Sequence, residues 1–182
     1  MAFYRLNYTK GDTAKLLVDV GSVLGNCSMN KATLHRMSDT CILGEFATTD
    51  RFWGGPDNIP LFFVLECNRP FARVDGWNEN GIQPDAEQVA GDAAGMVLNF
   101  DLKESNEVMF KIGMSYTSME NAVDNLRAEL DGWDFDGVCR ETRAIWNNTL
   151  GRIAVEGGSD AQRIKFYTDL WHVCWVVTKS AT

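Results

Sequence analysis

The sequence lacks features on which several classes of protein depend. It has only two histidines, His35 and His172, and they lie far apart, so a histidine-based metal site has no clustered ligands. Its 17 Lys and Arg residues form no cluster and the net charge is -8, which argues against a nucleic-acid partner. A neutral or cationic ligand fits this charge better, and a sugar is neutral.

No stretch approaches the roughly twenty apolar residues of a membrane span. Met1 is followed at once by a strand-like segment, without the charged start and apolar core of a signal peptide. We therefore expect no membrane association, and a cytoplasmic location if the chain is expressed as given. The five cysteines are odd in number and form no Cys-x-x-Cys pair, so we expect neither a complete disulfide framework nor a zinc ribbon, and we expect most of them to be buried thiols.

The first two thirds of the chain predict an antiparallel β-sandwich. About eight short apolar or alternating segments are separated by Gly, Pro, Asn and Asp clusters that are typical of turns. The short connection around Gly11 predicts that the first two strands pair with each other, and the aperiodic segment 78–94 predicts a long loop. The expected strands are Phe3–Tyr8, Ala14–Val20, Lys31–Met37, Cys41–Ala47, Leu61–Cys67, Phe71–Trp77, Gly95–Asp101 and Glu107–Tyr116.

The last third predicts three helices. Ser118 can cap the first, which ends at Asp131-Gly132, and the second begins near Asp134 and ends around Gly151. The third begins at Ser159, with Gln162 in a capping-box position. Strands followed by helices indicate an α+β fold, with a partial sandwich over 1–117 and a helical part over 118–182.

Four phrases in this order and spacing carry a resemblance: KIGMSYTSMENAVDNL, GWDFDGV, IWNNTLGRIAVEGGSDAQ and KFYTDLWH. They resemble glycoside hydrolase family 92, the calcium-dependent exo-α-mannosidases, at the junction between a β-sandwich and an (α/α)6 barrel. The resemblance implies that residues 118–182 are the linker helices and the first barrel helix. It also implies an inactive fragment that lacks the earlier sandwich strands and the catalytic barrel.

The resemblance further implies a periplasmic or secreted parent enzyme that uses calcium. The family's catalytic acid, catalytic base and calcium ligands belong to the barrel, so we assign no catalytic residue, metal ligand or cofactor to this chain. The tail after Val173 departs from the family. A one-base shift before Cys174 would restore a Leu-Gly continuation, because Trp has one codon and Val codons begin with GT.

Glycoside hydrolysis usually needs two carboxyl groups, and acidic residues are present at Asp131, Asp134, Asp136 and Glu141. Asp134 and Asp136 stand where a helix begins, so we interpret them as residues that cap the helix and complement its dipole. His172, beside Trp171 on a helix, is interpreted as a structural residue.

Two tryptophans are candidates for binding a mannose-containing glycan, because sugars stack on flat aromatic rings that have polar groups beside them. Trp53 lies in a Gly-rich loop with acidic and basic neighbours, and Trp77 is followed by Asn78 and Glu79. The competing interpretation is that both rings only pack against the sandwich.

The sequence is therefore compatible with three functions. The first is a piece of an α-mannosidase, and the second is a non-catalytic carbohydrate-binding sandwich. The third is an interaction fragment that self-associates, either through the stripe Phe166, Tyr167 and Trp171 or through unpaired strand edges.

Overall fold

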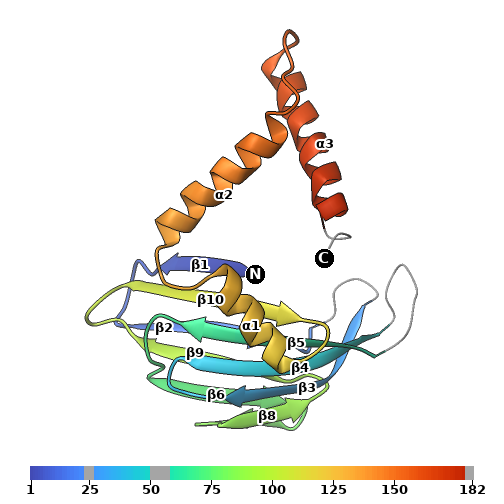
Figure 1. Cartoon of the computed structure of the whole chain (residues 1–182). Coiled ribbons are helices and arrows are strands. Elements are labelled where there is room, and N and C mark those ends of the chain that lie inside the picture. Colours follow the sequence, from blue (N-terminus) through green and yellow to red (C-terminus); the bar gives the residue numbers. More distant parts are fainter. Residues whose placement is uncertain (23–26, 50–57, 179–182) are drawn as a thin grey trace. The chain divides into compact units, whose positions relative to one another are not determined.

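The computed structural model describes residues 1–22, 27–49 and 58–178, with the backbone alone from 175 to 178 (Figure 1). The chain divides into two compact units, Met1–Trp133 and Asp134–Thr182. The elements within the described ranges are β1 (Ala2–Asn7), β2 (Thr13–Asp19), β3 (Ser28–Arg36), β4 (Cys41–Thr49), β5 (Ile59–Cys67), β6 (Arg73–Asn78), β7 (Gly81–Gln83), β8 (Gln88–Gly91), β9 (Gly95–Asp101), β10 (Glu107–Ser115), α1 (Met119–Glu129), α2 (Phe135–Leu150) and α3 (Asp160–Thr178).

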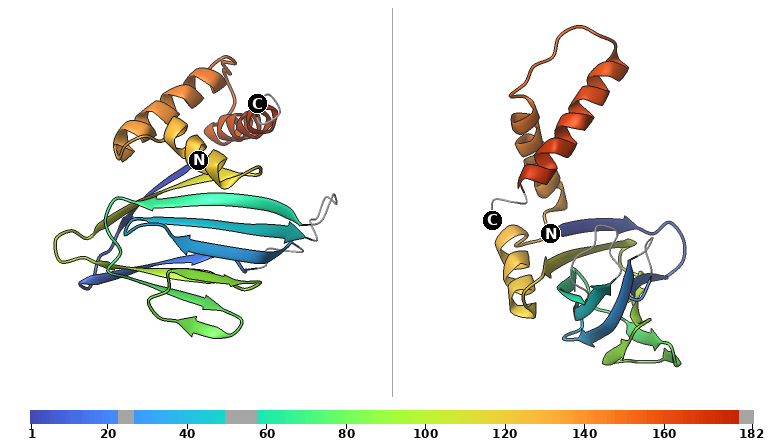
Figure 2. Two further views of the ribbon diagram at one scale, coloured as in Figure 1. Left: turned by 60° about the horizontal axis from the view of Figure 1, so that its bottom comes forward. Right: turned by 90° about the vertical axis from the view of Figure 1, so that its right-hand side faces the viewer.

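The first unit is a sandwich of two antiparallel sheets, as Figure 2 shows. The larger sheet has the order β1-β10-β5-β4-β3-β8 and the smaller has the order β2-β9-β6-β7. Every second residue of each strand points into the space between the sheets, which forms the core. The predicted α+β class, with a sandwich followed by helices, is confirmed.

The core is filled by apolar side chains from both sheets. Leu34 and Ile42 come from the larger sheet, and Met96, Leu98 and Phe100 come from the smaller one; all five have 0% exposure. Burying each such side chain contributes roughly 1.5–3 kcal/mol relative to leaving it in water. This core holds the outer faces of the two sheets in fixed positions.

Two expectations about strand connections are wrong. The first two strands do not pair, because β1 pairs with β10 and β2 pairs with β9 in the other sheet. The segment predicted as a long loop contains β7 and β8, which pair with β6 and β3. Both of these strands are too short for a period of two to be recognised in the sequence.

The expectation that most cysteines are buried is also wrong. Cys67 is buried, Cys27, Cys41 and Cys174 are half-buried, and Cys139 is exposed. Burial, followed by the charge of Glu66, raises the pKa of the Cys41 thiol to about 11. Burial, followed by the interaction with Cys41, raises the pKa of Cys67 to about 12. Both thiols are therefore protonated and unreactive at neutral pH.

Helix α1 packs on the outer face of the larger sheet, over β10 and β5. Its N-terminus is capped by Ser118, whose hydroxyl accepts the amide of Asn121 at 3.1 Å, as predicted. Ala122 and Leu126 are fully buried against the sheet at the position of Gly113 in β10. The helix is therefore an integral part of the first unit.

A buried lysine fastens the C-terminal end of α1 to the sheet. Lys111 of β10 has 1% of its side chain exposed, and its Nζ donates to the carbonyl oxygen of Leu130 at 2.9 Å. The same ammonium lies 4.3 Å from the centre of the Trp133 ring and 3.9 Å from Glu66, which also pairs with Arg127 at 2.5 Å. Burial lowers the pKa of Lys111. We call these five residues the Lys111 anchor.

The second unit contains the two helices α2 and α3. Asp134 caps α2 by accepting the amide of Gly137 at 2.8 Å, which confirms its interpretation as a capping residue. Ser159 and Gln162 form the predicted capping box at the start of α3, with the Ser159 amide donating to Gln162 Oε1 at 2.8 Å. Among the helices of the described residues, none combines the length and apolarity that a membrane span requires.

Candidate functional site

Trp77 lies on the outer face of the smaller sheet. In β6 it stands opposite Gly95 of β9 and Ile82 of β7. The outward-pointing residues Asp75 and Val97 form the neighbouring pair. Trp53, the other predicted stacking residue, lies outside the described residues. The structure therefore locates one of the two predicted sugar-binding tryptophans.

The indole of Trp77 rests flat on the backbone of Gly95. A Cβ atom at Gly95 would lie 2.1 Å from Cζ2 and 2.4 Å from Cη2 of the Trp77 ring, so only glycine leaves room for the ring. The Trp77 side chain as a whole is half-buried. A fixed aromatic surface of this kind is suited to stacking against the C–H face of a sugar.

A polar network lies beside the ring. Asp75 is 9% exposed and accepts hydrogen bonds from Arg73 Nε at 3.0 Å, Asn99 Nδ2 at 3.2 Å and the Asp85 amide at 3.3 Å. Burial on its own would raise the pKa of Asp75, but these donors together hold its pKa below the usual value. Asp75 is thus an ionised acceptor that orients Arg73 and Asn99, and it is not a proton donor.

Asp75→Ala should lower the free energy of unfolding by about 2 kcal/mol at pH 7, because Asn99 and the Asp85 amide would lose an acceptor. Since the folded-state pKa is lowered, this contribution is present above the ordinary carboxyl pKa of about 4. It is lost as the pH falls through the folded-state value. Urea denaturation of parent and variant should therefore give a difference that shrinks in acid; a difference independent of pH would contradict this role.

An apolar band crosses the same face. It consists of Leu17 in β2, Val97 in β9, Trp77 in β6 and Ile82 in β7. Leu17 is 63% exposed and Ile82 is 78% exposed, so the band presents apolar surface at both of its ends. No local pattern in the sequence predicts this band, because its members come from four separate strands. We call the band and the Asp75 network the Trp77 face.

The described residues do not fit a calcium ion. Calcium sites need six to eight oxygen ligands, commonly from several carboxylates. Within the described ranges, no group of three or more His, Cys, Asp or Glu residues could hold a metal ion. The charged pairs that do occur, such as Arg73 with Asp75 and Arg127 with Glu66, join opposite charges and stabilise the fold.

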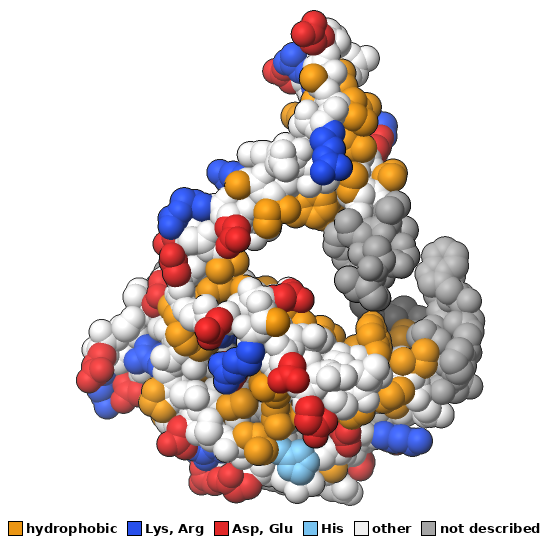
Figure 3. All heavy atoms as spheres, viewed as in Figure 1, with side chains coloured by type: hydrophobic (Ala, Val, Ile, Leu, Met, Phe, Trp, Pro, Cys, Tyr) orange, Lys and Arg blue, Asp and Glu red, His pale blue; other side chains and the backbone are white. Residues whose placement is uncertain are grey.

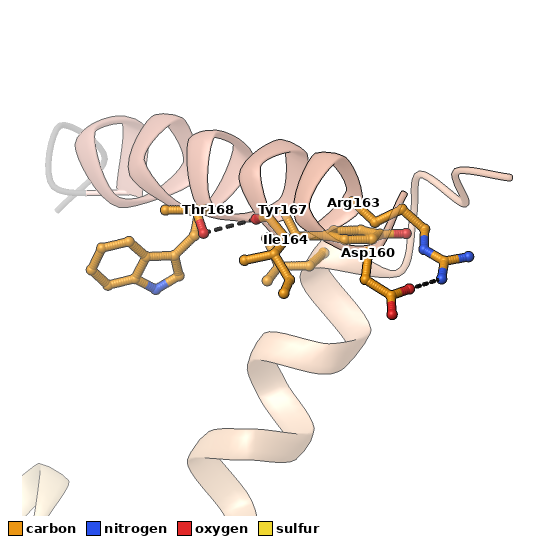
Figure 4. Close-up of a pocket in the computed structure, with 7 residues that line it drawn as sticks. Asp160, Arg163, Ile164, Tyr167 and Thr168 are labelled. Atoms are coloured by element: carbon orange, nitrogen blue, oxygen red, sulfur yellow. Dashed lines mark hydrogen bonds and ion pairs between the residues drawn. The ribbon is translucent and has the colours of Figure 1, made fainter. Parts of the chain in front are cut away.

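The second unit has an apolar groove on α3, shown in Figure 4. Its volume is about 640 Å³, and Figure 3 shows hydrophobic side chains gathered along both helices of this unit. Tyr167 is held by a hydrogen bond from its hydroxyl to the Ile153 carbonyl at 3.0 Å, and Trp171 contacts Trp146 at 5.8 Å between ring centres. The groove is lined by Leu150, Asp160, Arg163, Ile164, Tyr167, Thr168 and Trp171.

Two family models match the chain in succession. The glycosyl hydrolase family 92 N-terminal domain matches residues 1–115, and the glycosyl hydrolase family 92 catalytic domain matches residues 121–181. None of the curated proteins that were compared with the chain matches it.

Solved structures share the fold. The inverting mannosidase BT2199 of family GH92 from Bacteroides thetaiotaomicron VPI-5482 is 23% identical over 93% of this chain and 22% of its own, with a TM-score of 0.77. The family GH92 alpha-mannosidase BT3965 from Bacteroides thetaiotaomicron is 21% identical over 93% of this chain and 23% of its own, with a TM-score of 0.81. The gh92 family glycosyl hydrolase ccman5 is 26% identical over 86% of this chain and 20% of its own, with a TM-score of 0.72. The chain thus spans about a fifth of the length of these structures.

Proposed function

Because the chain belongs to glycosyl hydrolase family 92, we propose that it forms part of an enzyme that hydrolyses α-mannosides with inversion of configuration. The observation that carries the proposal is the succession of the two matches, an N-terminal domain over 1–115 and a catalytic domain over 121–181. Two of the similar structures, BT2199 and BT3965, are described as mannosidases, which supports mannosides as the substrate class.

We further propose that the 182 residues have no hydrolase activity by themselves. An inverting glycosidase needs one carboxylic acid with a raised pKa, placed roughly 6.5–9.5 Å from a second carboxylate. The pKa values of Asp75, Asp101 and Glu120 are all shifted downward, opposite to the shift that a proton donor needs. Each of them accepts hydrogen bonds from its own sheet, turn or helix end, so none is suited to donate a proton.

The proposal is tested by two assays with a chromogenic α-mannoside, each with and without calcium. The purified chain should release no product above the blank, and release by this chain would refute the proposed inactivity. The second assay uses a longer protein, in which these residues are expressed together with any coding sequence that flanks them in the source DNA. This protein should hydrolyse the substrate, and NMR of the product should show inversion at the anomeric carbon. Retention of configuration, or hydrolysis of other glycosides only, would refute the proposed reaction.

A second function, carbohydrate binding without catalysis, is favoured by the Trp77 face. The ring rests on Gly95, and Asp75, in the neighbouring outward pair, holds the Arg73 guanidinium further along the same face. This arrangement supplies an aromatic platform and, on the same face, a guanidinium whose position is fixed before a ligand arrives.

Trp77→Ala should weaken binding of methyl α-mannoside by about fivefold, because a stacked ring contributes about 1 kcal/mol. Trp77→Phe keeps an aromatic ring over Gly95 and should retain most of the affinity. Isothermal titration of the parent and both variants measures the difference. Equal affinity in all three would show that the sugar, if bound, does not use this face.

A further inference from the structure

The two sheets of the sandwich differ in width, and the difference leaves part of the larger sheet uncovered. The larger sheet has six strands and the smaller has four, with β2 at one edge of the smaller sheet. Along the inner face of β10 the exposed fraction rises from 0% at Val108 to 44% at Met114. Tyr4 of β1 stacks on Phe110 at 4.8 Å between ring centres and is 46% exposed. The inner face of β10 and β1 therefore continues beyond β2.

An apolar groove lies between this uncovered face and β2. Its volume is about 380 Å³, and apolar side chains from both sheets line it. They include Tyr4, Leu16, Val18, Phe63, Phe110 and Ile112. Apolar surface that stays in contact with water favours burial by a further apolar element of structure.

The backbone of β2 alternates between two directions. The Val20 amide donates to the Ala94 carbonyl at 3.3 Å. The Leu102 amide donates to the Asp12 carbonyl at 2.8 Å. Because paired residues alternate along an antiparallel ladder, the even-numbered residues of β2 bond to β9 and the odd-numbered ones point away from it. The edge of β2 therefore offers the backbone groups of its odd-numbered residues.

Two of these odd-numbered residues leave their outward backbone groups unpaired. The Lys15 carbonyl accepts the Tyr8 hydroxyl at 3.2 Å, which closes the edge at that end. The outward amide and carbonyl groups of Leu17 and Asp19 have no hydrogen-bond partner among the described residues. An unpaired edge beside an apolar groove is a template for one more strand.

A second copy of the chain cannot fill this groove through its own β2. Two β2 strands that pair antiparallel are related by a two-fold axis perpendicular to the joined sheet, so both larger sheets lie on the same side of that sheet. Each larger sheet extends beyond its own β2, and the two would occupy the same space. A single extended segment avoids this collision.

We propose that the groove receives one further β-strand, which pairs with β2 at Leu17 and Asp19 and comes from the same polypeptide outside residues 1–182. The inference rests on the proposed function, which makes these residues part of a longer enzyme; the chain spans about a fifth of the similar structures. A strand that is joined to the sandwich by its own chain has a high effective concentration, so a short pairing suffices to hold it.

The surroundings define the sequence of this strand. Its inward side chains fill the apolar groove, and its outward side chains lie beside the exposed residues Lys15, Leu17 and Asp19. An apolar residue opposite Leu17, an acidic one near Lys15 and a basic one near Asp19 give favourable cross-strand pairs. The strand therefore alternates between apolar inward residues and mixed outward ones.

Hydrogen exchange compares the 182-residue chain with the longer protein expressed from the source DNA. The Leu17 amide should exchange on the order of 100-fold more slowly in the longer protein, because the added strand accepts it. The Val18 amide, which already bonds to β9, is the control and should change much less. Equal rates for Leu17 in the two proteins overturn the proposal, and so does a source DNA without further coding sequence.

Leu17→Pro tests the pairing itself. Proline removes an amide that the 182 residues do not use, and an edge strand tolerates it there. In the longer protein the Asp19 amide should exchange at least about tenfold faster in Leu17→Pro than in the matched control Leu17→Ala, which keeps the amide. In the 182-residue chain the two variants should give the same rate. Equal rates in the longer protein overturn the proposal.

These measurements are independent of the hydrolase assays. A longer protein that protects the Leu17 amide but does not hydrolyse the mannoside refutes the proposed function alone. One that hydrolyses the mannoside without protecting this amide refutes the added strand alone.

Discussion

Gly113→Val is expected to lower the free energy of unfolding by about 3 kcal/mol, the upper end of the range for overpacking a tight interior. A Cβ atom at Gly113 would lie 2.4 Å from the Ala122 carbonyl oxygen, 2.7 Å from Leu126 Cβ and 2.9 Å from Val64 Cγ1. Two of these atoms belong to the backbone or lie next to it, so a side-chain rotation cannot relieve the clash. Helix α1 would have to move away from the sheet and expose Ala122 and Leu126.

Urea denaturation followed by circular dichroism measures this effect. Met114→Val is the matched control, because it places the same side chain at the next position of β10, where Met114 is 44% exposed. We expect the control to change the stability by no more than about 0.5 kcal/mol. A loss below about 1 kcal/mol in Gly113→Val would show that α1 does not pack as tightly as the structure indicates.

Lys111→Ala is expected to cost about 3 kcal/mol, through three losses at the Lys111 anchor. The Leu130 carbonyl would lose its donor, the Trp133 ring would lose the cation above it, and the lysine stem would leave a cavity. Glu66 keeps its pairing with Arg127, so no isolated buried charge remains to add to the cost.

Hydrogen exchange gives the local measurement for this variant. The variant should raise the exchange rates of the amides in the last turn of α1, near Leu126 and Leu130. This increase relative to the parent should be larger than the increase for the amides of the core strands. Lys111→Met keeps the apolar stem and should recover part of the lost stability. Lys15→Ala removes an exposed strand lysine and should change the free energy of unfolding little. Unchanged exchange in α1 would show that Lys111 does not fasten the helix.

Local signals in the sequence predicted the helix starts correctly. Ser118, Asp134 and Ser159 each cap a helix through hydrogen bonds that span only three residues. Such contacts depend on neighbours in the sequence, so a single chain reveals them. Eight of the ten described strands are likewise predicted from their own composition, because alternation and turn residues are local features.

Partners distant in the sequence could not be predicted in the same way. Lys111 looks like an ordinary strand lysine, and its burial follows only from the helix that covers it. Trp77 was singled out for its aromatic ring, but its fixed position depends on Gly95, which lies on another strand. The positive φ of Lys31 is held by a hydrogen bond from its amide to Asp92, which lies 61 residues further along the chain.

The pairing of β1 with β10 has a consequence for the order in which the sandwich forms. Ala2 stands opposite Ile112 and Asn7 stands opposite Glu107, so β1 is synthesised about one hundred residues before the strand that it pairs with. Closing a loop of that length costs about 2 kcal/mol more than closing one of about ten residues. The larger sheet should therefore assemble late in synthesis, and the arrival of β10 should be the step that limits its rate of folding.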